Sequence, residues 1–212
     1  MADLRVGGET APPMARNTLE FLPRAAQRVV PWKNGGGRTR EVALGSRSDG
    51  PGFRWRVSVA EVASDGPFSF FPGIDRTLWL LRGRGMSLEI DGASHRLDEP
   101  LASVAFPGEA TVSAHLIDGP TEDLNVMVER SSTRAETRIV RVESNGELLA
   151  PASPCEVVLL VLEGELAVGD GRREVLRLAA GDAMLACGVG RGFSLQAERG
   201  TALALSAVFS PG

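Results

Sequence analysis

Short apolar runs, separated by glycine, proline and aspartate, recur along most of this 212-residue chain and constrain its fold more than any other feature. Helical periodicity is scarce, so the pattern predicts an all-β protein built as a sandwich or barrel. A short helical piece is expected only around Ala25. The predicted strands are residues 54–62, 77–81, 86–90, 102–106, 111–116, 124–129, 156–162, 165–168, 183–186, 193–197 and 202–209.

The β pattern repeats after 81 residues. Gly83 follows an apolar run as Gly164 does 81 positions later, and the same interval relates Val112 to Phe193. Self-similarity at so long a period indicates two copies of one β module, because the units of a solenoid are about half that length or less. We therefore expect a mobile N-terminal tail over residues 1–16, a first module over 17–132, and a connector with the second module over 133–212.

Composition excludes several kinds of partner. The formal net charge of −4 gives no reason to expect binding to nucleic acid or to an acidic membrane surface. No segment has the ~18–20 uncharged apolar residues of a membrane span, and residues 1–16 lack the apolar core of a signal peptide. A cytoplasmic protein is expected, with Cys155 and Cys187 as reduced thiols.

The segment at 32–41, WKNGGGRTRE, contains three consecutive glycines. Glycine loses much conformational entropy on folding, so such a run is retained where the chain needs positive φ or where another group approaches the backbone closely. Neither P-loop nor dinucleotide-binding spacing is present. The segment is either a turn joining two strands or part of a binding site for a small polar ligand, with candidate residues Lys33, Asn34, Gly36, Thr39, Arg40 and Glu41.

Several cationic side chains stand where a β fold could bring them to one cavity. Arg56 and Ser58 share one face of a predicted strand, and Arg76 follows a Pro-Gly turn. The planar guanidinium matches carboxylate oxygens, so such a cavity would select a small carboxylate; a surface salt bridge is the alternative for each arginine. Asn125 lies in an otherwise apolar strand, so its amide either faces the cavity or completes a buried hydrogen-bond network.

Four motifs resemble those of the HutD/Ves family of bicupin proteins. They are WKNGGGRTRE at 32–41, WRVSVAEV at 55–62, DGPFSFFPGIDR at 65–76 and DLNVM at 123–127, all in the predicted first module. The resemblance implies a double cupin, with two jelly-roll β-barrel modules in one chain. It also implies a cytoplasmic bacterial protein associated with histidine utilisation and its control.

Most cupin enzymes hold a metal ion through histidines, and this chain has two histidines, His95 and His115. The histidine positions of a cupin metal site hold other residues here, so neither a metal nor another cofactor is expected. His115 shares a polar strand face with Thr111 and Ser113. That face either lines the cavity, which makes His115 a candidate ligand-binding residue, or is the solvated face of the sheet.

The second module differs from the first, because its segment 157–162 is apolar on both faces. A strand of this kind is buried on both sides, so we expect the second module to pack against the first or against another subunit. A homodimer is compatible with this pattern. The site is therefore expected in the first module, and the second is expected to have a structural role.

Two classes of function follow. The first is a non-catalytic binding protein that captures a small carboxylate, such as a histidine-degradation intermediate, and governs or reports its level. The alternative is a metal-independent isomerase, epimerase or hydrolase of a small carboxylic acid, with His115 or Glu41 as general base beside the arginines. The sequence contains no nucleophile elbow and no Ser-His-Asp order, which favours the first class.

Overall fold

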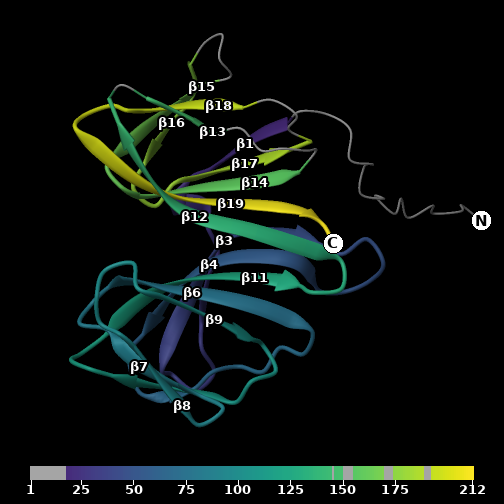
Figure 1. Ribbon diagram of the computed structural model, residues 1–212, viewed down its shortest axis with the longest axis vertical. Coiled ribbons are helices and arrows are strands. Elements are labelled where there is room, and N and C mark those ends of the chain that lie inside the picture. Colours follow the sequence, from purple (N-terminus) through teal and green to yellow (C-terminus); the bar gives the residue numbers. More distant parts are fainter. Residues whose placement is uncertain (1–17, 145, 150–154, 170–173, 189–191) are drawn as a thin grey trace, which may run out of the picture.

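Four β-sheets form two modules that stack on one another (Figure 1). The computed structural model describes residues 18–144, 146–149, 155–169, 174–188 and 192–212, so the tail expected at 1–16 lies outside the described residues. Strands dominate, as predicted, and the short segment around Ala25 is the 3-10 helix η1 (Arg24–Ala26). Among the described residues, no helix reaches the length and apolarity needed to cross a membrane.

The first module pairs a six-stranded sheet with a four-stranded sheet. The larger sheet, in the order β2-β3-β4-β11-β6-β9, contains β2 (Val29–Pro31), β3 (Gly37–Ser46), β4 (Phe53–Val62), β11 (Thr121–Glu129), β6 (Ile74–Arg82) and β9 (Ser103–Pro107). The smaller sheet, in the order β5-β10-β7-β8, contains β5 (Gly66–Pro67), β10 (Val112–Leu116), β7 (Met86–Ile90) and β8 (Ala93–Leu97).

The second module has the same plan. Its five-stranded sheet, in the order β1-β17-β14-β19-β12, contains β1 (Thr18–Leu22), β17 (Ala183–Cys187), β14 (Glu156–Glu163), β19 (Thr201–Pro211) and β12 (Thr133–Glu143). Its four-stranded sheet, in the order β13-β18-β15-β16, contains β13 (Glu147–Leu149), β18 (Phe193–Ala197), β15 (Glu165–Gly169) and β16 (Glu174–Ala179).

The repeat predicted at 81 residues is present strand by strand. β10 and β18 lie 81 residues apart at both ends, and β4 to β11 correspond in order to β12 to β19. The sheet order β4-β11-β6-β9 accordingly matches β12-β19-β14-β17. Among the described residues, β1, η1 and the β2–β3 hairpin have no counterpart in the other module; the hairpin extends the first module's sheet beside β4.

β1 belongs to the second module's sheet, although residues 17–132 were expected to form the first module. Its residues Thr18–Leu22 pair antiparallel with β17, so this strand covers the sheet edge that β17 would otherwise expose. The expected connector also begins with a full strand, because β12 pairs with β19 along Thr133–Glu143. The alternation of residues 137–142 indicates a strand within the connector, but the partner of each strand depends on long-range pairing, which local sequence patterns do not reveal.

An apolar core between the two larger sheets joins the modules. Trp55 of β4 stacks on Phe209 of β19 with ring centroids 4.4 Å apart and planes 8° apart. Val158 of β14 also belongs to this inter-module core, whereas its neighbours Val157 and Leu159 fill the second module's own core. The expected burial of this strand on both sides is confirmed within one chain, and a homodimer stays a prediction.

Candidate functional site

A cavity of about 720 Å³ opens on the inner face of the first module's six-stranded sheet. Its floor is formed by β3, β4, β11 and β6, and its walls by the β2–β3 turn and by residues 67–69 and Phe71. Eight of the eleven residues predicted from the sequence line this cavity: Lys33, Asn34, Thr39, Glu41, Arg56, Ser58, Arg76 and Asn125.

The strand register arranges the floor in three rows across the sheet. The rows are Arg56 with Met127 and Arg76, then Glu41 with Ser58 and Asn125, and then Thr39 with Ala60 and Asp123. Successive rows are two residues apart along each strand, which is about 7 Å. Cations therefore lie in one row, and the carboxylate and amide oxygens lie in the next two.

Arg76 is the most enclosed cation of the cavity, with 6% of its surface exposed. Its guanidinium carbon lies 5.2, 5.6 and 5.0 Å from the ring centroids of Phe68, Phe71 and Phe106, which form a cation–π cage. Nη1 donates to the carbonyl oxygen of Ser69 at 3.4 Å, whereas Nε has no hydrogen-bond partner. Burial lowers the pKa of Arg76 to about 10, so the side chain stays charged at neutral pH.

Arg56 forms an ion pair within the cavity. Its Nε lies 3.1 Å from Oε2 of Glu41, across the pairing of β3 with β4. The geometry does not make a hydrogen bond, so Arg56 Nε is buried without a hydrogen-bond partner. Because Glu41 already faces a cation, its carboxylate is poorly placed to act as a free general base.

Asp123 is a buried carboxyl group at the floor of the cavity, with 1% of its surface exposed. Burial raises the pKa of Asp123 to about 7, against the attraction of Arg76, which lowers it. Its Oδ1 atom has no hydrogen-bond partner. The cavity thus holds a carboxyl group whose ionisation state changes near neutral pH.

The three glycines form the turn from β2 into β3. Gly35 has a φ of +73°, and its N–H donates to the carbonyl oxygen of Trp32 at 3.0 Å. At Gly37 an added Cβ would collide with the carbonyl oxygen of Glu61 and lie 3.0 Å from the Trp32 ring. Positive φ and close approach, the two reasons predicted for this run, are both present. The turn places Lys33 at the cavity wall.

A Gly37→Ala variant is expected to lose roughly 1–3 kcal/mol of unfolding free energy, because the new methyl group forces β3 away from β4 or displaces the Trp32 ring. Urea denaturation measures this loss. Gly66→Ala is the matched control, since a Cβ at Gly66 meets no heavy atom within 4 Å. Equal stabilities of the two variants would contradict the close packing proposed for this turn.

Three predicted ligand-binding residues lie outside the cavity. Arg40 points to the opposite face of β3 from Thr39, because side chains alternate along a strand, and its guanidinium donates to Gln27. Gly36 uses its backbone N–H within the turn, donating to Asn34 Oδ1 at 3.0 Å. His115 is on the exposed face of β10, with Nδ1 3.3 Å from Oδ2 of Asp65. His115 therefore lies on the solvated face of the sheet and not in the cavity.

The donor set of the cavity suits an anion better than a cupin metal ion. Its lining includes the cations Lys33, Arg56 and Arg76, which repel a metal ion, and it contains no histidine. Within the described part of the chain, no three His, Cys, Asp or Glu side chains gather closely enough to hold a metal. A small anionic ligand is the better match to these residues.

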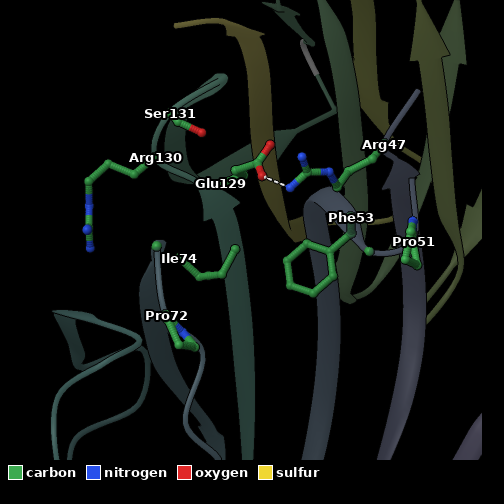
Figure 2. A pocket seen from close by; sticks show the side chains of 10 residues that line it. Arg47, Pro51, Phe53, Pro72, Ile74, Glu129, Arg130 and Ser131 are labelled. Atoms are coloured by element: carbon green, nitrogen blue, oxygen red, sulfur yellow. Dashed lines mark hydrogen bonds and ion pairs between the residues drawn. The ribbon is translucent and has the colours of Figure 1, made fainter. Parts of the chain in front are cut away.

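A second cavity, of about 380 Å³, shares Phe53 with the first. Figure 2 shows the Phe53 ring at this hollow and Arg47 turned toward Glu129. Each of its two arginines faces two carboxylates: Arg47 faces Asp49 and Glu129, and Arg130 faces Asp75 and Glu109. Because both arginines here face two carboxylates, whereas Arg56 of the first cavity faces one, this cavity is a poorer site for a carboxylate than the first.

The second module lacks three of the polar floor residues that β6 and β11 contribute in the first. At the repeat interval, Arg76 corresponds to Val157, Asp123 to Ala204 and Asn125 to Ser206. Val157 and Ala204 belong to that module's apolar core. The β2–β3 hairpin, which carries Lys33 and Glu41, is also absent from the second module's sheet. The combination of Arg76, Asp123 and Asn125 on one floor is therefore specific to the first module.

Asp123 and the aromatic residues around Arg76 were not among the ligand-binding residues predicted from the sequence. The pattern could have revealed Asp123, because it stands two residues before Asn125 and hence on the same strand face. Phe68 and Phe71 had no comparable pattern, since they lie in a segment without regular periodicity. Only the tertiary structure brings their rings to Arg76.

Together the fold and the cavity define a two-module cupin-like protein with a polar cavity in its first module. Solved structures under 25% identical share this fold, including the pirin YhhW from Escherichia coli (TM-score 0.66) and an oxalate decarboxylase mutant from Bacillus subtilis (TM-score 0.62). The chain belongs to the HutD family, whose model matches residues 24–205.

Relatives with higher identity support this assignment. An uncharacterised 21.2 kDa protein in the hutC 3′ region of Pseudomonas putida is 36% identical over 78% of this chain and 85% of that protein. Protein Ves of Escherichia fergusonii is 40% identical, but over 57% of this chain and 63% of that protein. The structure of HutD from Pseudomonas fluorescens SBW25 (formate condition) is 25% identical, covers 92% of this chain and 100% of that chain, and has a TM-score of 0.79.

Proposed function

We propose that this protein binds a small carboxylate in its first module and thereby regulates histidine utilisation without catalysis. The observation that carries the proposal is made at the floor of a 720 Å³ cavity, where buried Arg76 and half-buried Arg56 each have a buried Nε atom without a hydrogen-bond partner. Guanidinium groups hydrogen-bond carboxylate oxygens in a planar geometry, and the cavity volume lies in the range of small-molecule sites, roughly 300–1,000 Å³.

The regulatory part of the proposal is supported by membership of the HutD family and by the relative in the hutC 3′ region. A ligand derived from histidine breakdown would connect the cavity to that context. The cytoplasmic location and the homodimer expected from the sequence remain predictions. The second module has an apolar core, and we expect it to stabilise the chain rather than to bind a ligand.

Calorimetric titration tests the binding proposal with urocanate, N-formylglutamate, glutamate and formate as ligands. We expect saturable binding of at least one acid, reduced about tenfold or more in Arg56→Ala because a buried charge-assisted hydrogen bond is lost. Arg82→Ala is the matched control, since Arg82 is 62% exposed and outside the cavity. Absence of binding by all four acids would contradict the carboxylate proposal.

Asp123 favours a second candidate, a metal-independent enzyme acting on a small carboxylic acid. A carboxyl group whose pKa is raised to about 7 by burial is suited to general acid–base catalysis, provided that it reaches the substrate. His115 lies outside the cavity and Glu41 is paired with Arg56, so Asp123 replaces both as the candidate base. Recovery of each ligand unchanged after incubation supports the binding protein, and product formation supports the enzyme.

A further inference from the structure

Residues 23–28 cross from the second module to the first, and we call this segment the strap. It follows β1, which lies beside β17 in the second module's sheet (Figure 1), and it leads into β2 at the edge of the first module's sheet. The 3-10 helix η1 lies within it. Hydrogen bonds from the strap reach both modules, so this segment connects them by more than the chain itself.

The strap is anchored to a turn of the second module. Its Arg24 N–H donates to Oδ1 of Asp182 at 2.8 Å. Gln27 Nε2 donates to the carbonyl oxygen of Gly181 at 3.0 Å. Oδ2 of Asp182 accepts a further bond from Ala179 N–H at 3.0 Å, which fixes the carboxylate within its own turn. Gly181 has a φ of +92°, and an added Cβ there would lie 2.5 Å from Cδ of Arg24, so glycine allows the strap to approach this closely.

The strap also bonds to β3 of the first module. Oε1 of Gln27 accepts a hydrogen bond from Nη1 of Arg40. The carbonyl oxygen of Arg28 accepts one from Glu41 N–H at 2.9 Å. The side-chain amide of Gln27 therefore joins the two modules. β2 covers the edge of β3 over three residues, Val29–Pro31, so the strap supplies contacts there that a short strand does not.

Arg40 lies in a hollow of about 50 Å³ between the modules. Val59 of β4 and Leu160 of β14 line the same hollow. Burial lowers the pKa of Arg40, and the nearby charge of Arg24 lowers it further. Because a desolvated charge is unfavourable without hydrogen-bond partners, the bond to Gln27 is more important for Arg40 than it would be for an exposed arginine.

The neighbours of Arg40 along β3 belong to the cavity. Thr39 and Glu41 line it from the opposite face of the strand. Thr39 Oγ1 accepts a hydrogen bond from Nε1 of Trp32 at 2.8 Å. Glu41 pairs with Arg56. Since residues 39–41 share one stretch of backbone, the position of Arg40 determines where its two neighbours lie in the cavity.

We propose that Gln27 and Arg40 are positioning residues, which hold β3 of the cavity in place against the second module. A binding site requires support from residues outside it, because the groups that touch the ligand must be held precisely. The second module thereby contributes to affinity without contacting the ligand. The effect on affinity rests on the proposed carboxylate-binding function, whereas the positioning of β3 does not.

NMR of the folded protein tests the positioning of β3 without a ligand. In Arg40→Met and in Gln27→Leu, the Trp32 indole N–H resonance is expected to shift upfield. The reason is that displacement of β3 weakens the hydrogen bond from this N–H to Thr39. A loss of stability alone leaves the resonance in place, since the spectrum reports the folded state. Arg38→Met is the matched control and is expected to leave the resonance near its wild-type position, because Arg38 shares the strand face of Arg40 but pairs with Glu61.

Calorimetric titration with urocanate, N-formylglutamate, glutamate and formate measures the effect on affinity. For any acid that the wild-type protein binds, Arg40→Met and Gln27→Leu are each expected to weaken binding on the order of tenfold, because a displaced site binds less well. The double variant is expected to bind as the single variants do, since both remove the same contact. Arg40→Lys retains a donor for Gln27 and is expected to restore part of the affinity.

The outcomes distinguish the positioning of β3 from the proposed function. An unchanged Trp32 resonance in both variants, or an equal shift in Arg38→Met, overturns the positioning of β3. A shifted resonance with wild-type affinity overturns the contribution of the strap to binding and leaves carboxylate binding intact. Failure of the wild-type protein to bind any of the four acids overturns the proposed function, and the resonance still decides whether the strap positions β3.

Discussion

An Asp123→Asn variant is expected to be more stable than the wild-type protein at pH 8, with a gain in unfolding free energy on the order of 4 kcal/mol. Burial raises the pKa of Asp123 from 3.8 to about 7, whereas the pKa of the same group in the unfolded chain stays near 3.8. A difference of about three pKa units corresponds to roughly 4 kcal/mol at about 1.36 kcal/mol per unit. Asparagine has a similar shape and needs no ionisation.

The direction of the pH dependence follows from proton binding. Between about pH 4 and pH 7 the folded protein retains a proton on Asp123 that the unfolded chain has released. Since stability falls with rising pH wherever the folded state binds more protons, Asp123 progressively destabilises the fold across this window. Above about pH 7 both states are ionised and the penalty is constant. The advantage of the variant should therefore grow from near zero at pH 4 to its full value at pH 8.

Urea denaturation of both proteins at intervals from pH 4 to pH 8 measures this difference. Other carboxyl groups, such as Asp65 and Glu109, have lowered pKa values, but they contribute equally to both proteins and cancel in the comparison. Asp118→Asn is the surface control, because its side chain is 78% exposed. A stability difference that does not change with pH would contradict the buried, protonated state of Asp123.

Replacement of Arg76 by valine is expected to weaken carboxylate binding on the order of 100-fold or more. Arg76 is held by three phenyl rings and has an unpartnered Nε, so a bound carboxylate would gain a desolvated charge-assisted hydrogen bond. Valine stands at the corresponding position of the second module, Val157, where it is buried. Calorimetric titration with the four acids named above measures the loss.

Arg76→Lys and Arg84→Ala complete this experiment. The lysine variant retains the charge but not the planar donor group, so it is expected to bind more weakly than wild type and more tightly than the valine variant. Arg84→Ala is the control, since Arg84 is 78% exposed and outside the cavity. Wild-type affinity in Arg76→Val would show that the carboxylate does not bind at Arg76.

Local patterns predicted much of the strand content. Residues 86–90 and 193–197 were predicted with the bounds that β7 and β18 have. β3 was not predicted, because its first residue closes a run of three glycines that indicates a turn. Without this strand, Thr39, Arg40 and Glu41 were all predicted to face the ligand. The pleat of β3 places Arg40 on the opposite face from Thr39 and Glu41.

Periodicity and composition were enough to predict the all-β class, the duplication and the location of the polar residues in the first module. The membership of β1 in the second module and the exposure of His115 became visible only in the folded chain. Tertiary structure also decided that Asp123 lies with Arg76 in one cavity. Such relations depend on pairing and packing between residues far apart in the chain. Local propensity does not encode them.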